Sequence, residues 1–144
     1  MKNLNLTLIA MFLLILFSCS NEAKNSEPDE SDCKKIIKRI NSPDKIVDVV
    51  LVEVNGGTTV ADSHRVYIVI HNREIAASDT PIFIADYISD IDIEWTTDNL
   101  ASIKYNKARI FSFTNFWQSE KLDDWKYIVE VKLVNTSEDG KALK

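Results

Sequence analysis

The chain has 144 residues and is 45% hydrophobic and 9% aromatic, which is enough apolar material for one domain with a packed core. This composition excludes general disorder. The formal net charge is -5 and the basic residues form no dense stripe, so we expect no nucleic-acid partner.

The first 18 residues have the pattern of an export signal. Lys2 gives a positive start, and residues 6–17 form an almost wholly apolar run. The run has signal-peptide length and is too short to span a bilayer comfortably, which takes about 20 apolar residues. It ends in Leu16-Phe17-Ser18-Cys19, which resembles the lipobox of bacterial lipoproteins. The pattern predicts cleavage before Cys19 and lipid on its sulfur; a plain secretory signal and a short uncleaved anchor are the alternatives.

The segment after Cys19 is polar. Residues 20–31 contain no large apolar side chain, so nothing there can offset the entropy of ordering. We interpret residues 19–31 as a lipidated cysteine and a flexible tether with a root-mean-square reach of roughly 20 Å. This interpretation places a domain of residues 32–135 at an inner or outer membrane of a bacterial cell envelope, and leaves residues 136–144 as a polar tail.

Residues 32–40 are predicted to form a short helix with Ser31 as its N-cap. Four apolar side chains would share one face at helical spacing: Cys33, Ile36, Ile37 and Ile40. The helix would either dock on a sheet or rest on anionic lipid through its basic residues. If Cys19 carries lipid, Cys33 has no intrachain partner, so we expect a buried, inert thiol or an intermolecular disulfide.

The rest of the domain has the pattern of an all-β fold. Residues 46–54 and 65–70 are dense in Val and Ile, as central strands covered on both faces are. Seven short strands are predicted in all, over residues 46–54, 65–70, 82–85, 91–95, 101–105, 109–113 and 127–133. Their spacing predicts an antiparallel meander or sandwich.

Part of this region resembles a family of small uncharacterised bacterial domains. The shared features are a Ser42-Pro43-Asp44 opening, an Asn55-Gly56-Gly57-Thr58-Thr59 loop before a strand, and a Trp95-x-x-x-x-Leu100 element followed by Ile103-x-Tyr105. The resemblance covers residues 42–105. Lys45 stands where that family carries a glycine after the aspartate. The resemblance implies an all-β domain and brings no established activity.

The Gly56-Gly57-Thr58-Thr59 segment is the first candidate binding site. Two glycines allow a positive φ and close approach of a ligand to backbone amides, and the two hydroxyls add donors. The alternative is a hairpin connection that needs glycine for its turn. No Gly-Lys-Ser/Thr follows, so the segment is not a phosphate-binding P-loop.

Trp117 and Trp125, on either side of the charged segment 118–124, are the second candidate. An exposed tryptophan would give a platform for a glycan or a protein partner, and a buried one would belong to the core. Phe111 and Phe113 alternate along a predicted strand, so we expect both to point into the core.

The remaining polar groups show no reaction centre. His64 and His71 would point to opposite faces of an extended strand, so they would share no metal. The acidic side chains between Asp90 and Glu94 would line a solvated strand face rather than a calcium site. Ser63 and His64 are adjacent on a strand and cannot act as nucleophile and base. The sequence therefore predicts no catalytic residue, metal or cofactor.

Together these features predict a lipid-anchored cell-envelope protein. We expect a non-catalytic module that contacts another envelope protein, with membrane lipid as the partner of Cys19. The alternative is a small-ligand or glycan binder, which needs a concave pocket with an exposed aromatic side chain. A hydrolase would need a convergent Ser/His/Asp or metal constellation, which the sequence does not offer.

Overall fold

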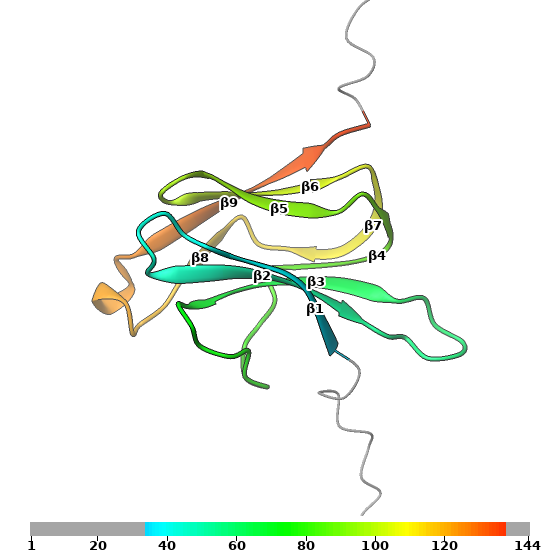
Figure 1. Cartoon of the computed structure of the whole chain (residues 1–144), viewed down its shortest axis with the longest axis horizontal. Coiled ribbons are helices and arrows are strands. Elements are labelled where there is room, and N and C mark those ends of the chain that lie inside the picture. Colours follow the sequence, from blue (N-terminus) through cyan, green and yellow to red (C-terminus); the bar gives the residue numbers. More distant parts are fainter. Residues whose placement is uncertain (1–33, 138–144) are drawn as a thin grey trace, which may run out of the picture.

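The computed structural model describes residues 34–137, which form two stacked β-sheets (Figure 1). The expected signal peptide, Cys19, the tether, Ser31 and Cys33 lie outside the described residues, and so do residues 138–144. The described part of the chain has one turn of 3-10 helix, at Asp123–Trp125, and contains no helix that could cross a membrane.

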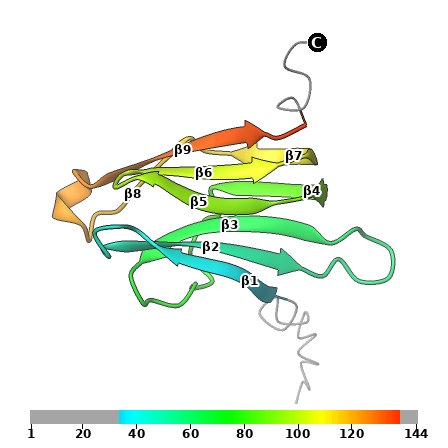
Figure 2. The ribbon, with the colours of Figure 1, turned by 45° about the horizontal axis from the view of Figure 1, so that its top comes forward.

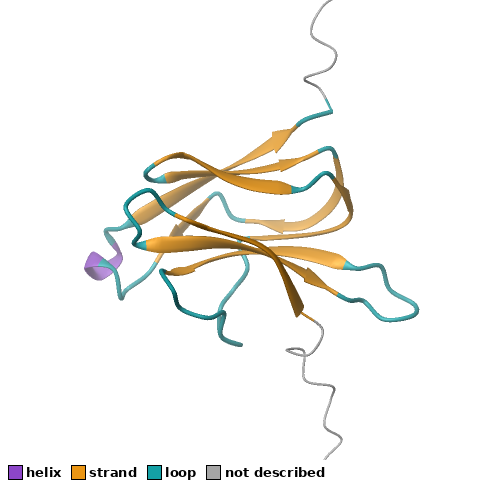
Figure 3. Ribbon diagram, viewed as in Figure 1, coloured by secondary structure: helices purple, strands orange, loops and turns teal. Residues whose placement is uncertain are grey.

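The fold is a β-sandwich of nine strands (Figure 3). One sheet has the strand order β1-β2-β3-β4-β7, and the other has the order β5-β6-β9-β8. The strands are β1 (Lys34–Asn41), β2 (Val47–Val54), β3 (Ser63–Ile70), β4 (Phe83–Ser89), β5 (Asp92–Thr97), β6 (Leu100–Tyr105), β7 (Lys107–Phe113), β8 (Phe116–Gln118) and β9 (Ile128–Asn135). The predicted all-β class is confirmed, and of the two predicted architectures the sandwich is the one observed.

The chain changes sheets between β4 and β5, between β6 and β7, and between β7 and β8. Neighbouring strands are antiparallel except for β6 and β9, which run side by side in the same direction with Ile103 opposite Leu133 (Figure 2). The sequence did not predict this parallel pair. The chain between β6 and β9 passes through β7 of the other sheet, so this parallel pair needs no crossover helix.

Strand β2 is buried on both faces, as its run of Val residues predicts. Val47, Val49 and Leu51 belong to the core between the sheets. That core also contains Val66, Ile68, Ile82, Phe83, Ala85, Ile93, Ala101, Ile103, Val129 and Val131. A second cluster forms around β2 and β3 from Val50, Val52, Val54, Tyr67 and Val69.

The helix predicted for residues 32–40 is wrong where the structure describes it, because Lys34–Asn41 form the edge strand β1, antiparallel to β2. A β-bulge lies between Ile36 and Lys38, so Ile37 has no residue opposite it. The bulge interrupts the alternation of apolar and polar residues that a strand normally has. As a result, Ile36, Ile37 and Ile40 have the spacing of residues on one face of a helix. Pairing with β2 satisfies the backbone groups that a helix would have satisfied internally.

A second bulge overturns the prediction for Phe111. Ile84 lies opposite Ser112 and Ala85 lies opposite Ile110, so Phe111 is the extra residue of β7. Its side chain is 60% exposed, whereas the other predicted core phenylalanine of this strand packs against the core. Strand β8 was also not predicted, because three residues are too few to show an alternating pattern.

Candidate functional site

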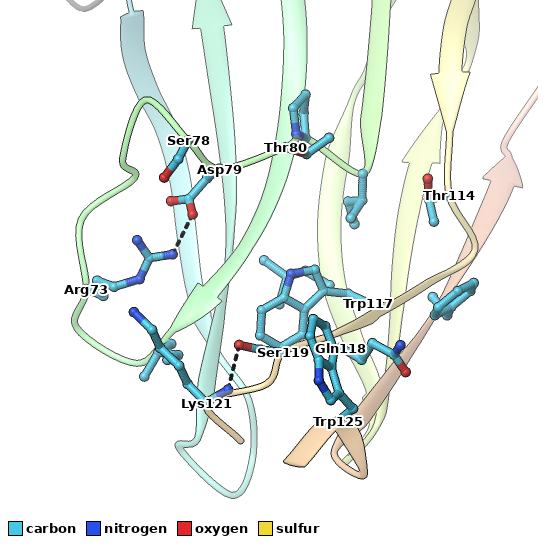
Figure 4. A pocket seen from close by; sticks show the side chains of 15 residues that line it. Arg73, Ser78, Asp79, Thr80, Thr114, Trp117, Gln118, Ser119, Lys121 and Trp125 are labelled. Atoms are coloured by element: carbon cyan, nitrogen blue, oxygen red, sulfur yellow. Dashed lines mark hydrogen bonds and ion pairs between the residues drawn. The ribbon is translucent and has the colours of Figure 1, made fainter. Parts of the chain in front are cut away.

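A hollow of about 550 Å³ lies beside the second half of β3 (Figure 4). Three segments form it: the end of β3, the connection of residues 71–82, and residues 114–125. We call it the tryptophan hollow. Its lining residues are Ile68, Ile70, Arg73, Ser78, Asp79, Thr80, Pro81, Ile82, Thr114, Phe116, Trp117, Gln118, Ser119, Lys121 and Trp125.

The hollow exists because β4 pairs with only half of β3. The paired residues of β3 are Ser63 to Val66. The Val66 carbonyl still accepts a hydrogen bond from Ile82 N–H at 2.8 Å. Beyond that point no strand among residues 34–137 lies beside β3 on this side, and Ile68 and Ile70 line the hollow instead.

The two predicted tryptophans meet at this hollow. Trp117 lies on β8 opposite Val129 and packs against the core between the sheets. Trp125 is 50% exposed. Figure 4 shows both rings on the same side of the hollow, and no hydrogen bond within residues 34–137 engages either indole N–H. The half-exposed Trp125 ring therefore keeps one donor for a ligand.

The backbone that carries Trp125 is strained. Asp123, Asp124 and Trp125 have φ angles of 48°, 45° and 69°, in the left-handed region. This region costs a residue with a Cβ roughly 1–2 kcal/mol. Such strain persists only where the surrounding structure imposes it, and it is concentrated at functional sites. The strained turn holds the exposed indole at the rim of the tryptophan hollow.

A buried carboxylate positions the opposite wall. Asp48 on β2 is fully buried. Its Oδ2 accepts from Arg39 Nε at 2.9 Å and from Asn72 N–H at 3.0 Å, and its Oδ1 lies 2.7 Å from His71 Nδ1. Arg39 also donates to the Arg73 carbonyl at 2.6 Å. This network fixes the start of the 71–82 connection against β1 and β2.

The same contacts control the ionisation of Asp48. Burial alone would raise the pKa of this carboxyl, because it penalises the charged form. The hydrogen bonds from His71, from Asn72 N–H and from Arg39 outweigh burial and lower the pKa below its ordinary value. Asp48 is therefore a charged structural anchor at neutral pH.

Charged side chains form the rim of the tryptophan hollow. Arg73 donates to Asp79 at 2.8 Å, and Ala76 N–H donates to the same carboxylate at 2.7 Å. Burial would raise the pKa of Asp79, but these two bonds and the nearby charge of Lys121 lower it. With two positive side chains and one negative, the rim carries one net positive charge in a chain whose formal charge is -5.

The glycine-containing candidate lies at the opposite end of the sandwich, in the loop between β2 and β3 (Figure 1). Asn55 Oδ1 accepts from Gly57 N–H at 2.7 Å, and Asp62 Oδ1 accepts from Gly56 N–H at 3.0 Å. Gly57 has a φ of 77°, and a Cβ on Gly56 would lie 2.4 Å from a backbone oxygen. The loop therefore uses both glycines and both amides structurally. Binding by it, or by the two exposed threonines that follow, stays a prediction.

The histidines take part in separate contacts. His64 Nε2 lies 3.9 Å from Glu53 Oε1, while His71 contacts Asp48. Ser63 and His64 are consecutive residues of β3, so their side chains point to opposite faces of the sheet. The structure does not bring them together as a nucleophile and a base.

The acidic face of β5 is engaged by lysines. Asp92 pairs with Lys38 of β1 at 2.5 Å, and Glu94 pairs with Lys104 of β6 at 2.7 Å. These pairs are partly exposed, as expected for a solvated strand face. Among residues 34–137, no group of three or more His, Cys, Asp or Glu side chains is arranged to hold a metal ion.

Comparisons of the chain with protein-family models, with curated proteins and with solved structures found no match. The resemblance of residues 42–105 to small bacterial domains stays a prediction. At the position where that resemblance has glycine, Lys45 adopts a φ of 59°, which is the conformation that a glycine would take there.

The sequence identified one wall of the tryptophan hollow and missed the other. Trp117 and Trp125 were predicted from their type and their position beside a charged segment. The charged rim was not, because polar residues in a loop carry no local mark of what they will face. Asp48 did carry a signal, since a single carboxylate inside an apolar run must find buried partners.

Proposed function

We propose that this chain is a lipid-anchored protein of the cell envelope, held by Cys19, that binds another envelope protein without catalysing a reaction. The binding site would be the tryptophan hollow. The observation that carries this proposal is that Trp117 and Trp125 line one concave site with exposed aromatic surface. Anchoring is supported by the export signal and the lipobox-like residues that end at Cys19.

A protein partner is supported by apolar surface that continues beyond the hollow. Phe116 and Trp125 line the hollow and are 46% and 50% exposed, and Ile128 on the adjoining β9 is 44% exposed. Ile128 lies opposite Gln118, which also lines the hollow. Extended apolar surface with a polar rim is typical of protein contacts, and tryptophan is among the residues that most often dominate their binding energy.

The polar groups of the hollow favour binding over catalysis. Asp79 is held by Arg73 and by a backbone N–H, and its lowered pKa makes it a weak proton acceptor at neutral pH. Neither histidine belongs to the lining. The site thus has surfaces for contact and charge for orientation, and no group poised to exchange a proton.

Trp125→Ala in the full-length chain tests the proposal. Immobilised protein in detergent would be exposed to envelope extract, and retained proteins quantified by mass spectrometry and then purified. We expect a partner that binds the wild-type chain and loses about 2 kcal/mol, or about thirty-fold in Kd, with Trp125→Ala.

Phe111→Ala is the matched control, because Phe111 is similarly exposed and lies outside the lining. It should bind the purified partner as the wild type does, and both variants should unfold at the wild-type temperature. If no purified protein distinguishes wild type from Trp125→Ala, the proposal fails.

A glycan is the second candidate ligand. A half-exposed indole with a free N–H, next to the planar amide of Gln118, can stack on a sugar ring and bond its hydroxyls. Titration of the full-length chain with cell-wall oligosaccharides, followed by tryptophan fluorescence, tests this function. A saturable change that disappears in Trp125→Ala would support it, and an unchanged spectrum would exclude the oligosaccharides tried.

A further inference from the structure

In the half of β3 that lines the tryptophan hollow, one residue, Ile68, has an unpaired backbone edge, whereas the Ile70 carbonyl already accepts from Arg73 N–H at 3.0 Å. Consecutive residues of a strand direct their N–H and C=O groups to alternate sides. His71 N–H reaches the Ile46 carbonyl on the β2 side, and the Val66 carbonyl accepts from Ile82 N–H on the β4 side. Ile68 therefore directs its N–H and C=O toward the hollow, where no backbone bond within residues 34–137 engages them.

This edge makes the hollow a gap in the five-stranded sheet. Strand β3 has eight residues, and four of them pair with β4. An unpaired strand edge is a template for an extended peptide, whose main chain supplies the missing hydrogen bonds. Ile70 and Trp117 line the hollow and are partly exposed, so one apolar side chain of such a peptide would find an apolar surface.

The charge of the rim indicates a second feature of the ligand. Arg73 is occupied by Asp79 at 2.8 Å, whereas no ion pair within residues 34–137 engages Lys121. The charged side chains of the lining are Arg73, Lys121 and Asp79, so the lining itself has one more positive side chain than negative. An acidic side chain near Lys121 would complement it.

We propose that the partner enters the tryptophan hollow as a short extended segment that pairs with β3 as an added strand. Its apolar side chain contacts Trp117 and Trp125, and an acidic side chain lies near Lys121. This inference rests on the proposed function and makes it specific: the ligand is an extended peptide that pairs with Ile68 and is also recognised through its side chains.

A peptide selection tests the inference. The probe is a random peptide library displayed on phage, selected against the full-length chain in detergent and counter-selected against Trp125→Ala. The best peptide is then synthesised as a series with one N-methyl group at each amide in turn. Strand pairing predicts that methylation of one amide, the one that donates to the Ile68 carbonyl, weakens binding about ten-fold, the usual effect of a lost hydrogen bond, while the two neighbouring amides tolerate it.

Amide hydrogen exchange gives the matching signal from the protein. The amide of Ile68 should exchange faster than those of Tyr67 and Val69, which face β2, and should become protected when the peptide binds. Lys121→Ala should weaken a peptide that carries an acidic residue and leave its neutral variant unchanged.

The outcomes separate the two proposals. Binding that depends on Trp125 but shows neither a single methylation-sensitive amide nor protection of Ile68 would overturn strand pairing and leave the proposed function standing. If no selected peptide distinguishes wild type from Trp125→Ala, the peptide ligand is excluded. If no such peptide is found but oligosaccharides bind saturably, the ligand is a glycan. If no such peptide is found but a protein from the extract binds in a Trp125-dependent way, that protein binds without adding a strand to β3.

Discussion

Lys45 holds a backbone conformation that suits glycine. Its φ is 59°, and its N–H closes the turn onto the Ser42 carbonyl at 2.9 Å. Lys45→Gly removes a cost of about 1–2 kcal/mol for the left-handed residue and adds about 0.5–1 kcal/mol of chain entropy. We expect the free energy of unfolding to rise by about 0.5–1 kcal/mol in urea denaturation. Lys126→Gly, at a φ of -81°, is the control and should lower it.

Asp48 is a buried carboxylate held by three hydrogen-bonding partners. Asp48→Asn removes a buried charge that Arg39 and His71 contact, so the free energy of unfolding should fall by about 2–3 kcal/mol. Asp92→Asn is the matched control, because its ion pair with Lys38 is half exposed and should matter little. Equal losses in the two variants would contradict the assignment.

The pH dependence of stability follows from the same carboxylate. Its pKa in the folded protein lies below the ordinary value of 3.8. A lowered folded pKa means that the unfolded chain binds more protons, so the stabilisation is complete at neutral pH and is lost as the pH falls below about 4. Denaturant titrations from pH 7 downward should show a steeper loss for the wild type than for Asp48→Asn.

At the scale of elements, the turn between β1 and β2 ties one sheet to the other. Tyr127, next to the start of β9, donates its hydroxyl to Asp44 of that turn at 2.7 Å. Burial, together with this hydrogen bond, raises the pKa of Tyr127 to about 12. The turn itself is closed by Ser42, whose Oγ accepts from the N–H groups of Ile46 and Val47 at 3.1 Å.

Tyr127→Phe tests this connection. Loss of the hydroxyl should lower the free energy of unfolding by about 1 kcal/mol, because Asp44 loses one donor at a partly exposed site. The ultraviolet titration should also lose the tyrosine that ionises near pH 12. Tyr87→Phe is the control, since Tyr87 is highly exposed. A titration curve that keeps its transition near pH 12 in Tyr127→Phe would contradict the contact.

Bulges are the elements that the sequence concealed. Apolar and polar residues alternate regularly only while each residue pairs with one residue of the neighbouring strand. Ile37 and Phe111 are extra residues at bulges, and each interrupts this alternation. A helix was therefore predicted at β1, and Phe111 was predicted to be buried. Where alternation is unbroken or the strand is largely apolar, as in β2, β3 and β5, a strand was correctly predicted.

For the whole molecule, the proposed lipid anchor is the most direct prediction. Cys19→Ser removes the sulfur that would carry the lipid, so the chain should appear as a soluble or unprocessed precursor. Cell fractionation with immunoblotting measures this, and Cys33→Ser, which leaves the lipobox-like segment intact, should fractionate as the wild type does. A Cys19→Ser chain that stays with the membrane at wild-type size would exclude lipidation at this residue.

What the sequence by itself determined is local. Runs of Val and Ile mark the buried strands, and the polar segments between them mark the connections, because burial and backbone pairing act on neighbouring residues. The tertiary structure decided the parallel pairing of β6 with β9 and the meeting of residues 68–82 with residues 114–125 at the tryptophan hollow. These juxtapositions depend on where β4 leaves β3 and on how β8 returns beside β9, which are long-range consequences of strand order. Trp117 and Trp125 were candidates by their type and their position beside a charged segment; the fold made them the wall of a site.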